Sequence, residues 1–233
     1  MTPRPLRLFL DTADPAQWAE YLPLGVFFGV TCNPLLLQRA GQACTPDNLA
    51  RLGERAFELG AREIHLQAWG ETAGELAACG RVLAPLAPQV AVKLPATAEG
   101  LTAARMLVGE EIPVTLTAVY NAGQVLAAAA VGCAYAAPYL GRIDDLGREG
   151  TPEVIAMHEL LQNTAAPTRL LVASLRSWDK VVELAWEGLD TFTFGPAVAE
   201  AMLDDADTDE AAEAFLDAAQ AMGAPEIPAP DGD

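Results

Sequence analysis

The sequence predicts a (β/α)8 barrel, a TIM barrel, in a single domain, and three observations indicate this α/β fold class. Short apolar or β-branched runs alternate with helical segments along the whole chain, which is typical of repeated βα units. The 233 residues, 52% of them apolar, suffice for one such barrel. No long linker or low-complexity stretch divides them. We therefore expect one domain over residues 1–233, in which residues from about 205 to 233 form a C-terminal helix and tail.

Eight strands are expected, each recognised as a short run of apolar and β-branched residues. In chain order they are Arg7–Asp11, Val26–Thr31, Glu63–Ala68, Val90–Leu94, Pro113–Thr117, Ala134–Pro138, Arg169–Ala173 and Thr191–Phe194. Eight parallel strands with intervening helices close most naturally into a barrel. A doubly wound sheet is the alternative if one strand is wrongly assigned.

Helices between the strands are marked by capping side chains followed by residues typical of a first helical turn. Four such starts are Asp14-Pro15, Thr45-Pro46, Thr151-Pro152 and Ser177-Trp178. A last helix is expected over Asp209–Met222. Its apolar residues recur at helical spacing and can pack either within the subunit or across an interface. They are Ala212, Phe215, Leu216 and Ala219.

Charge argues against two classes of partner. The net charge of −18 disfavours nucleic acids and anionic membrane surfaces, because both need a positive field. Much of the excess lies between Asp204 and Asp217, which indicates a solvated helix face with acids near its start. No run of about 18 apolar residues suggests a membrane span, and the start of the chain lacks the apolar stretch of a signal peptide. A cytoplasmic location is expected.

Cysteine and histidine usage gives little support to a metal site or a redox cofactor. The four cysteines show no CxxC spacing, and we expect them to be reduced. The two histidines, His65 and His158, lack the spacing of paired metal ligands. His65 is expected to pack within a strand. No metal and no cofactor are predicted.

Lys93 is the residue that most clearly points to chemistry. It is one of two lysines in the chain and lies inside the apolar run Val90–Pro95. Removing water from an unpaired ammonium is costly, so burial favours the neutral amine, which can attack a carbonyl and form a Schiff base. The alternative is a side chain that reaches the surface from a strand edge. The other lysine, Lys180, falls in a helix and is expected to be exposed.

Polar residues at the predicted strand ends support the chemical interpretation. In a barrel the active site lies where the strands end, at the carboxyl face. Each residue also has an ordinary explanation alone, such as a turn or a strand end, but together they provide a nucleophile, proton-transfer groups and hydrogen bonds for hydroxyls. The strand-end residues are Asp11, Thr31, Asn33, Gln67, Lys93, Thr117, Tyr139, Ser174 and Arg176. An anionic substrate would need arginines against the negative background, which directs attention to Arg142 and Arg176.

Five segments of the chain closely resemble the small transaldolase family, and the match is nearest to its fructose-6-phosphate aldolase members. The resemblance runs in order from about residue 7 to about residue 220. Cys32 and Leu35 stand where the family often has Thr and Ser. The five segments are Leu10–Asp14, Gly29–Pro34, Val92–Gly100, Thr117–Tyr120 and Ala137–Asp144.

The resemblance implies a role for each of ten residues. Lys93 matches the Schiff-base lysine and Asp11 the carboxylate that handles the substrate hydroxyl proton. Asn33 and Thr31 match positions that hold donor hydroxyls. Thr117 matches a hydroxyl near the imine, and Gln67 a side chain that positions the catalytic water. Tyr139 matches a phenol that protonates the enamine. The phosphate-binding positions match Arg142, Ser174 and Arg176.

The resemblance leaves the reaction open between two subgroups. Gln67 and Tyr139 match the aldolase type, whereas Leu140-Gly141 before Arg142 is closer to transaldolase-type members. The leading hypothesis is a class I, metal-independent aldolase, an aldehyde-lyase that reversibly cleaves fructose 6-phosphate to dihydroxyacetone and glyceraldehyde 3-phosphate. The alternative is a transaldolase that transfers a dihydroxyacetone unit between sugar phosphates. A non-catalytic sugar-phosphate-binding barrel gives no reason for Lys93. The resemblance also implies a homo-pentamer or decamer in which the C-terminal helix reaches a neighbour.

Overall fold

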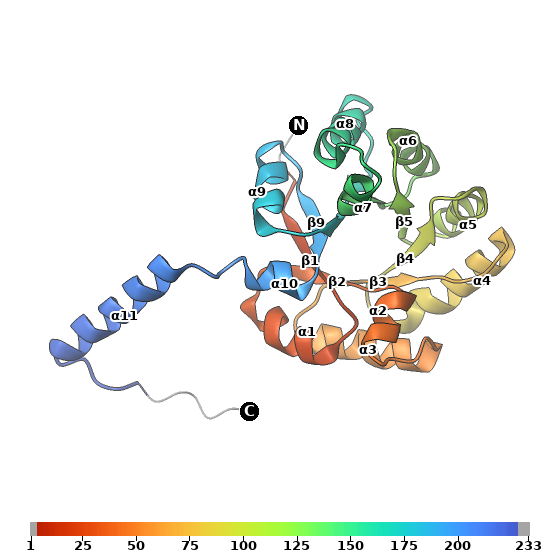
Figure 1. Ribbon diagram of the computed structural model, residues 1–233. Helices are drawn as coiled ribbons and strands as arrows, with labels where there is room; N and C mark the ends of the chain where they lie inside the picture. Colours follow the sequence, from red (N-terminus) through yellow and green to blue (C-terminus); the bar gives the residue numbers. More distant parts are fainter. Residues whose placement is uncertain (1–3, 228–233) are drawn as a thin grey trace.

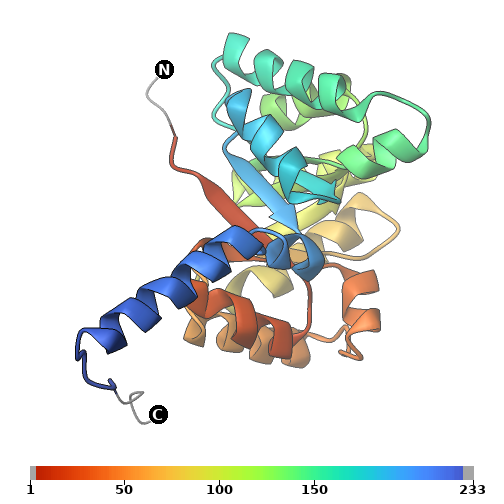
Figure 2. The same cartoon turned by 60° about the vertical axis from the view of Figure 1, so that its left-hand side comes forward.

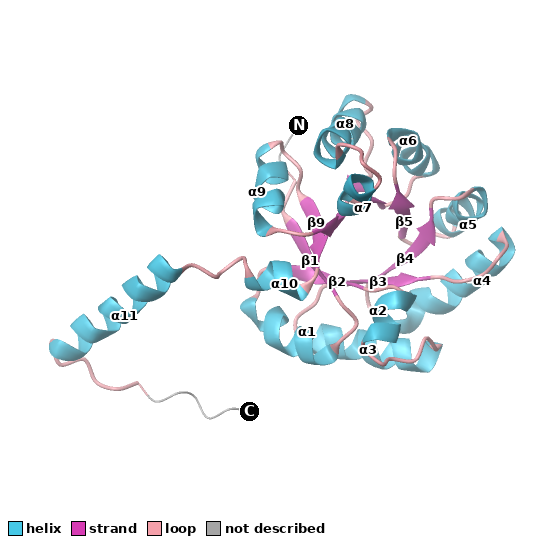
Figure 3. Cartoon of the chain, viewed as in Figure 1, coloured by secondary structure: helices cyan, strands magenta, loops and turns pink. Residues whose placement is uncertain are grey.

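The computed structural model describes residues 4–227 and confirms the (β/α)8 barrel (Figures 1 and 3). The view runs down the barrel, with the strands around the centre and the helices outside them. The strands are all parallel and are β1 (Arg7–Asp11), β2 (Phe27–Thr31), β3 (Glu63–Gln67), β4 (Val90–Pro95), β5 (Val114–Val119), β6 (Tyr135–Pro138), β7 (Arg169–Leu170), β8 (Val172–Leu175) and β9 (Thr191–Phe194).

The prediction of one seventh strand over Arg169–Ala173 is wrong in one respect. This segment forms two short strands, and the second of them continues to Leu175. The chain is interrupted at Leu171, so that β7 pairs with β6 while β8 pairs with β9 on the other side. The neighbour order is β7-β6-β5-β4-β3-β2-β1-β9-β8. A parallel bridge between Tyr139 and Ala173 links the two edges and completes the ring. The interruption therefore lets one strand contact both neighbours of a closing barrel.

All the helices except the last, α11, surround the barrel (Figure 1). They are α1 (Pro15–Tyr21), α2 (Pro34–Arg39), α3 (Pro46–Glu58), α4 (Ala73–Leu83), α5 (Ala98–Gly109), α6 (Ala122–Val131), α7 (Leu140–Asp145), α8 (Gly150–Asn163), α9 (Trp178–Trp186), α10 (Pro196–Glu200) and α11 (Ala206–Ala221), with short 3-10 turns at Leu22–Leu24 and Ala84–Leu86.

Three of the four predicted caps are confirmed. The side chains of Asp14, Thr45 and Ser177 accept hydrogen bonds from the first turns of α1, α3 and α9. The cap at Thr151 is wrong, because α8 already begins at Gly150. The Gly150 N–H donates to the Asp144 carboxylate at 2.9 Å, so α7 supplies the partner that a capping hydroxyl would have supplied.

The apolar core forms two layers. Residues on the outer faces of the strands pack under the helices, and Val30, Ile64 and Val92 are fully buried there. A smaller cluster that includes Phe9, Ala91, Tyr135, Ala137 and Leu171 lies apart from it. Because the strands carry buried residues on both faces, they appear in the sequence as nearly continuous apolar runs.

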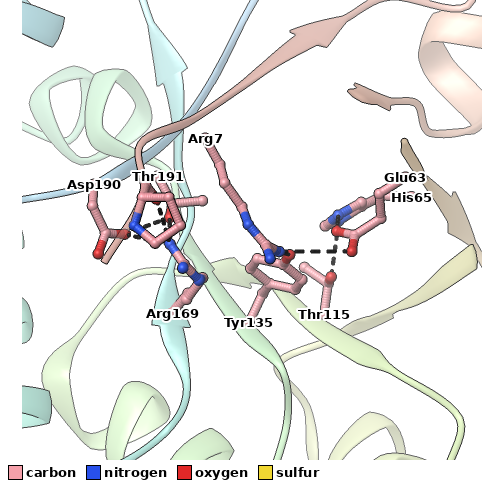
Figure 4. Close-up of polar contacts among 9 residues, drawn as sticks. Arg7, Glu63, His65, Thr115, Tyr135, Arg169, Asp190 and Thr191 are labelled. Carbon is pink, nitrogen blue, oxygen red and sulfur yellow. Dashed lines mark hydrogen bonds and ion pairs between the residues drawn. The ribbon is translucent and has the colours of Figure 1, made fainter. Parts of the chain in front are cut away.

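Polar side chains close the amino end of the barrel (Figure 4). The Tyr135 hydroxyl accepts a hydrogen bond from Arg7, and a guanidinium nitrogen of Arg7 lies 3.8 Å from the Glu63 carboxylate. His65 Nε2 is 2.7 Å from that carboxylate, and its Nδ1 is 2.9 Å from the hydroxyl of Thr115. Because a carboxylate only accepts, Nε2 carries the proton when Glu63 is ionised, and Nδ1 of a neutral ring accepts from Thr115.

The protonation states of this network follow from burial and pairing. Burial opposes ionisation of Glu63, but the hydrogen bond from His65, with Tyr135 and Arg7, leaves its pKa lowered. Burial lowers the pKa of His65, although Glu63 acts in the opposite direction. Burial also raises the pKa of Tyr135. Beside this network, Arg169 lies 3.1 Å from the carboxylate of Asp190 (Figure 4). The amino end is thus closed by a connected polar layer.

The C-terminal helix α11 leaves the barrel beside α10 and extends away from it (Figures 1 and 2). It begins at Ala206, earlier than expected, because the side chain of Asp205 accepts from the Thr208 N–H. None of its residues is buried; Phe215 is 74% exposed and Leu216 is 59% exposed. The option that this apolar face packs within the subunit is therefore wrong for the described chain. No helix among residues 4–227 is long and apolar enough to cross a membrane.

Candidate active site

A cavity of about 450 Å³ lies at the carboxyl ends of the strands, within the size range of small-molecule sites. Nine of the ten residues implicated by the sequence line it. They come from β1 to β5, from β8 and from the segments that follow β2 and β6, so that distant parts of the sequence meet in one place. The nine are Asp11, Thr31, Asn33, Gln67, Lys93, Thr117, Tyr139, Arg142 and Ser174; Arg176 is the tenth and does not line it.

Lys93 is buried in β4 and faces the cavity, so it is not a lysine that reaches the surface. It is 5% exposed, and its Nζ donates to the backbone carbonyl of Cys32 at 3.0 Å. The Cys32 N–H in turn donates to the His65 carbonyl. This bond holds Cys32, and with it the carbonyl that Lys93 contacts, beside β3. Burial raises the pKa of the Cys32 thiol to about 12, so this neighbour stays neutral. Lys180 is half-buried on α9 and pairs with Glu183, rather than standing free in solvent as expected.

Asp11 is oriented by a short chain of hydroxyl groups. The Thr31 hydroxyl donates to the Asp11 carboxylate at 2.6 Å. Since that proton is used, the 2.6 Å contact between Thr31 and Thr193 has Thr193 as the donor. Thr31 is fully buried, and Thr193 is 3% exposed. The buried hydroxyls therefore hold one face of the carboxylate and leave the other toward the cavity.

Tyr139 and Thr117 form a second pair of groups in the cavity. Their hydroxyl oxygens are 3.0 Å apart, and the ring of Tyr139 lies against Tyr120 with ring centroids 6.0 Å apart. Thr117 is 2% exposed. The next residue, Ala118, has a φ of 56°, a left-handed conformation that is strained for a residue with a side chain. A phenol and a hydroxyl in contact can pass a proton between them.

Asn33 and Gln67 are amides at the ends of β2 and β3. The Asn33 side-chain oxygen accepts from the N–H groups of Leu35 and Leu36, so Asn33 caps α2. This leaves the amide nitrogen of Asn33 as the atom that can contact a ligand. Gln67 makes one long contact, from its side-chain nitrogen to the Ala68 carbonyl at 3.4 Å. Both amides line the cavity.

The two arginines lie close to the carboxylate of Asp145, the last residue of α7. Arg176 donates to Asp145 Oδ2 at 2.6 Å, and Arg142 lies 4.0 Å from the same oxygen. The hydrogen bond and charge of Arg176 lower the pKa of Asp145, with a further contribution from Arg142. Ser174 has a φ of 59°, and its carbonyl lies so close to α7 that a Cβ at Gly141 would sit 2.4 Å from it. Gly141 therefore permits the contact between α7 and β8.

Sequence reasoning missed three features of this site. Thr193 could have been found, since Thr191 and Thr193 alternate along β9 and end beside Asp11. Arg39 lines the cavity from α2, but an arginine in a helix carries no distinguishing signal. The carbonyl of Cys32 holds Lys93, and a backbone contact of this kind cannot be read from residue type.

Comparison with known proteins identifies the family of the chain. The chain matches the family described as "Transaldolase/Fructose-6-phosphate aldolase" over residues 8–227. The buried Lys93 lies in the cavity with hydroxyl groups and the carboxylate of Asp11, as the sequence motifs predict. The protein belongs to this transaldolase/fructose-6-phosphate aldolase family.

Individual relatives carry a more specific name. A "Probable transaldolase" of Maricaulis maris is 34% identical over 211 residues, which is 91% of this chain and 95% of the relative. A "Probable transaldolase" of Thermus thermophilus is 34% identical over 216 residues, 91% of this chain and 97% of the relative. These names favour the transaldolase alternative over the aldolase hypothesis that the motifs placed first.

The solved structures show the fold alone. A thiamine phosphate pyrophosphorylase from Pyrococcus furiosus superposes with a TM-score of 0.60 at 13% identity. The match covers 84% of this chain and 91% of that chain. The similarity is one of barrel architecture, which many unrelated functions share.

Proposed function

We propose that the protein is a Schiff-base transaldolase that transfers a dihydroxyacetone unit between sugar phosphates. Lys93 is the observation that carries the proposal, because it is buried in a cavity of suitable size. A buried lysine among polar groups is the nucleophile that carbonyl chemistry needs. The names of the relatives support transfer over cleavage.

The proposed reaction begins when the neutral amine of Lys93 adds to the ketone carbonyl of the donor; one proton is taken up and water leaves, forming an iminium ion. Asp11 accepts the proton of the hydroxyl on the departing side of the bond that breaks. The electron pair of that bond forms the enamine, which neutralises the iminium nitrogen, and the aldehyde leaves. The enamine then adds to an acceptor aldehyde, and Asp11 returns its proton to the new hydroxyl. Water hydrolyses the product iminium and frees Lys93.

The remaining residues bind the substrate and hold water. We assign Asn33 to a donor hydroxyl through its amide nitrogen, whereas Thr31 acts by orienting Asp11. Gln67 and Thr117 are assigned to the water that enters and leaves during imine formation. The phosphate is assigned to three groups that can donate to it, with guanidinium groups suited to bidentate contacts. They are Arg142, Ser174 and Arg176.

Fructose-6-phosphate aldolase activity is the second candidate, and one contact favours it. The Tyr139 hydroxyl is 3.0 Å from that of Thr117, so it is placed to protonate the enamine with the help of water. Protonation would end the reaction by release of free dihydroxyacetone. Gln67 in place of an acid at the end of β3 is consistent with this outcome.

Reductive trapping tests the lysine. Borohydride added with dihydroxyacetone should attach one reduced donor unit to the peptide that contains Lys93, as mass spectrometry would show. With only two lysines in the chain, Lys180→Arg is a complete control, and it should trap normally. Attachment at Lys180 alone would contradict the proposal.

Release of dihydroxyacetone without an acceptor separates the two activities. A transaldolase should release little free dihydroxyacetone from fructose 6-phosphate, and its turnover should begin only when an acceptor aldehyde is added to take up the dihydroxyacetone unit. If release is substantial, Tyr139→Phe should lower it by about 10²–10⁴-fold while transfer falls less, because the variant keeps the ring and loses one proton donor. An unchanged ratio of release to transfer would remove Tyr139 from the mechanism.

We also propose that the chain forms a homo-pentamer or decamer through α11. Support comes from Phe215 and Leu216, which leave a large apolar area uncovered. Light scattering should give a mass of at least five subunits, and Phe215→Glu with Leu216→Glu should reduce it. A monomer at micromolar concentration would contradict this arrangement.

A further inference from the structure

Asp145 lies beside the two arginines assigned to the substrate phosphate. Its Oδ2 accepts a 2.6 Å hydrogen bond from Arg176 and is 4.0 Å from a nitrogen of Arg142. One oxygen atom thus contacts one guanidinium and approaches the other. A phosphate oxygen bound by both arginines would occupy a similar position. Arg176, held by this carboxylate, does not line the cavity, whereas Arg142 does.

The position of Asp145 has no evident structural purpose in α7. The neighbouring acid, Asp144, anchors the start of α8 through the Gly150 N–H. Asp145 is 43% exposed, and within residues 4–227 its carboxylate makes no hydrogen bond except that to Arg176. Its partners are the two arginines alone, both of them 59% exposed.

We propose that Asp145 is a specificity-determining residue that acts as an internal counter-anion for the phosphate site. In the ligand-free protein it pairs with Arg176 and Arg142, and a phosphate must displace it to bind both. This inference rests on the proposed function, since it assumes that the two arginines hold the substrate phosphate. Asp145 therefore weakens the binding of every anion at this position.

The consequence is selection for an anion that is attached to a sugar. Inorganic phosphate has only the two arginines and Ser174 to gain, so competition with Asp145 keeps its occupancy low. A sugar phosphate also gains contacts at Lys93, Asn33 and Asp11, which offset the displacement. An alternative role, in which Asp145 holds Arg176 ready for phosphate, predicts the opposite result, namely that Asp145→Asn binds phosphate more weakly than the wild type.

Binding of inorganic phosphate to the full chain tests the proposal. Calorimetry at low ionic strength should show that Asp145→Asn binds phosphate about two- to fivefold more tightly than the wild type, the range expected for loss of an exposed ion pair. The KM for a phosphorylated acceptor should fall by a similar factor without a rise in kcat. High salt should reduce the difference, because exposed charges are screened.

Matched variants separate this effect from a general change of charge. Asp144→Asn makes the same change one residue away, and Glu110→Gln breaks an exposed pair with Arg81 far from the cavity. Asp144 acts on Arg176 by its charge without a hydrogen bond to it, so Asp144→Asn should change phosphate affinity less than Asp145→Asn does. Glu110→Gln should leave phosphate affinity within experimental error of the wild type. Trapping of dihydroxyacetone at Lys93 reports whether the barrel of each variant is intact.

Two results would overturn the inference in distinguishable ways. If phosphate binding depends on Arg142 and Arg176 but is unchanged or weaker in Asp145→Asn, the counter-anion role is wrong and the phosphate site stands. If phosphate binding is absent even in Asp145→Asn, or is unaffected by Arg142→Gln and Arg176→Gln, both the phosphate site and the role of Asp145 are wrong.

Discussion

At the amino end of the barrel, Glu63 and His65 bind each other and three neighbours, whereas at the carboxyl end Asp11 and Lys93 face a cavity. The amino-end network pairs the buried polar atoms of Glu63 and His65 and leaves Arg7 Nε as the one buried side-chain nitrogen or oxygen in the described chain without a partner. At the carboxyl end, the described chain gives no hydrogen-bond partner to the Ser174 hydroxyl, and Lys93 Nζ has one.

The difference teaches that residue type alone does not identify the reactive end of a barrel. Acids, arginines, tyrosine and threonine occur at both ends, but only one end leaves them available to a ligand. Strained backbone does not separate the two ends, because Ala118 and Ser174 at the carboxyl end and Glu111 and Ala165 in the loops before β5 and β7 all have positive φ. Satisfied polar groups predict a structural role, and available ones predict chemistry.

Lys93→Met is expected to have the largest effect. That effect should be on activity at the carboxyl end and should leave stability nearly unchanged. The variant keeps the length of the side chain and removes the nucleophile, so kcat/KM should fall by at least about 10³-fold and borohydride trapping should vanish. One hydrogen bond to the Cys32 carbonyl is lost, so the free energy of unfolding should change by no more than about 1.5 kcal/mol. Urea unfolding and steady-state kinetics would measure both, and retained trapping would refute the assignment.

Glu63→Ala should give the converse result at the amino end. It removes the buried partner of His65 and Arg7, and breaking such a group typically costs about 3 kcal/mol. The folded fraction should still trap dihydroxyacetone at Lys93. Glu110→Ala is the matched control, because it breaks an exposed pair with Arg81 and should cost less than about 1 kcal/mol. Equal losses in the two variants would mean that the amino-end network contributes no special stability.

Sequence alone predicts the fold well and the site unevenly. The strands are recognisable because both faces are buried, so that β1 and β9 match their expected bounds. The interruption at Leu171 depends on closure of the ring and has no local signal. Lys93 stands out because an apolar run surrounds it, whereas the position of Arg176 depends on Asp145, a contact between separate βα units. Such partners are set by tertiary structure, which spacing does not encode.

The pH dependence of stability should sharpen the comparison by reporting on His65. Burial keeps its pKa below the ordinary value of 6.5, so the unfolded chain takes up a proton near pH 6.5 that the folded chain does not. Stability should therefore fall as the pH falls from about 7.5 to 5.5. In His65→Gln this dependence should flatten by up to about 1.4 kcal/mol per pH unit.

His158 provides the control for that measurement. Its pKa is also lowered by burial, so His158→Gln should flatten the same dependence separately, and a residual slope should remain in each single variant. Urea midpoints at several pH values would measure the slopes. If the wild type and His65→Gln have the same slope, the proton on His65 does not differ between the folded and unfolded states.

Ser174→Gly should have the smallest effect and should test whether strain at the carboxyl end serves the site. The φ of 59° suits glycine, so the variant should be about 0.5–1 kcal/mol more stable than Ser174→Ala, which lacks the hydroxyl but keeps the Cβ. Ala165→Gly is a control at a φ of 51° outside the cavity lining, and it should gain stability without loss of activity. If the strain positions the phosphate site, Ser174→Gly should raise the KM for phosphorylated acceptors more than Ser174→Ala does. Equal KM values would mean that the hydroxyl matters there and the backbone conformation does not.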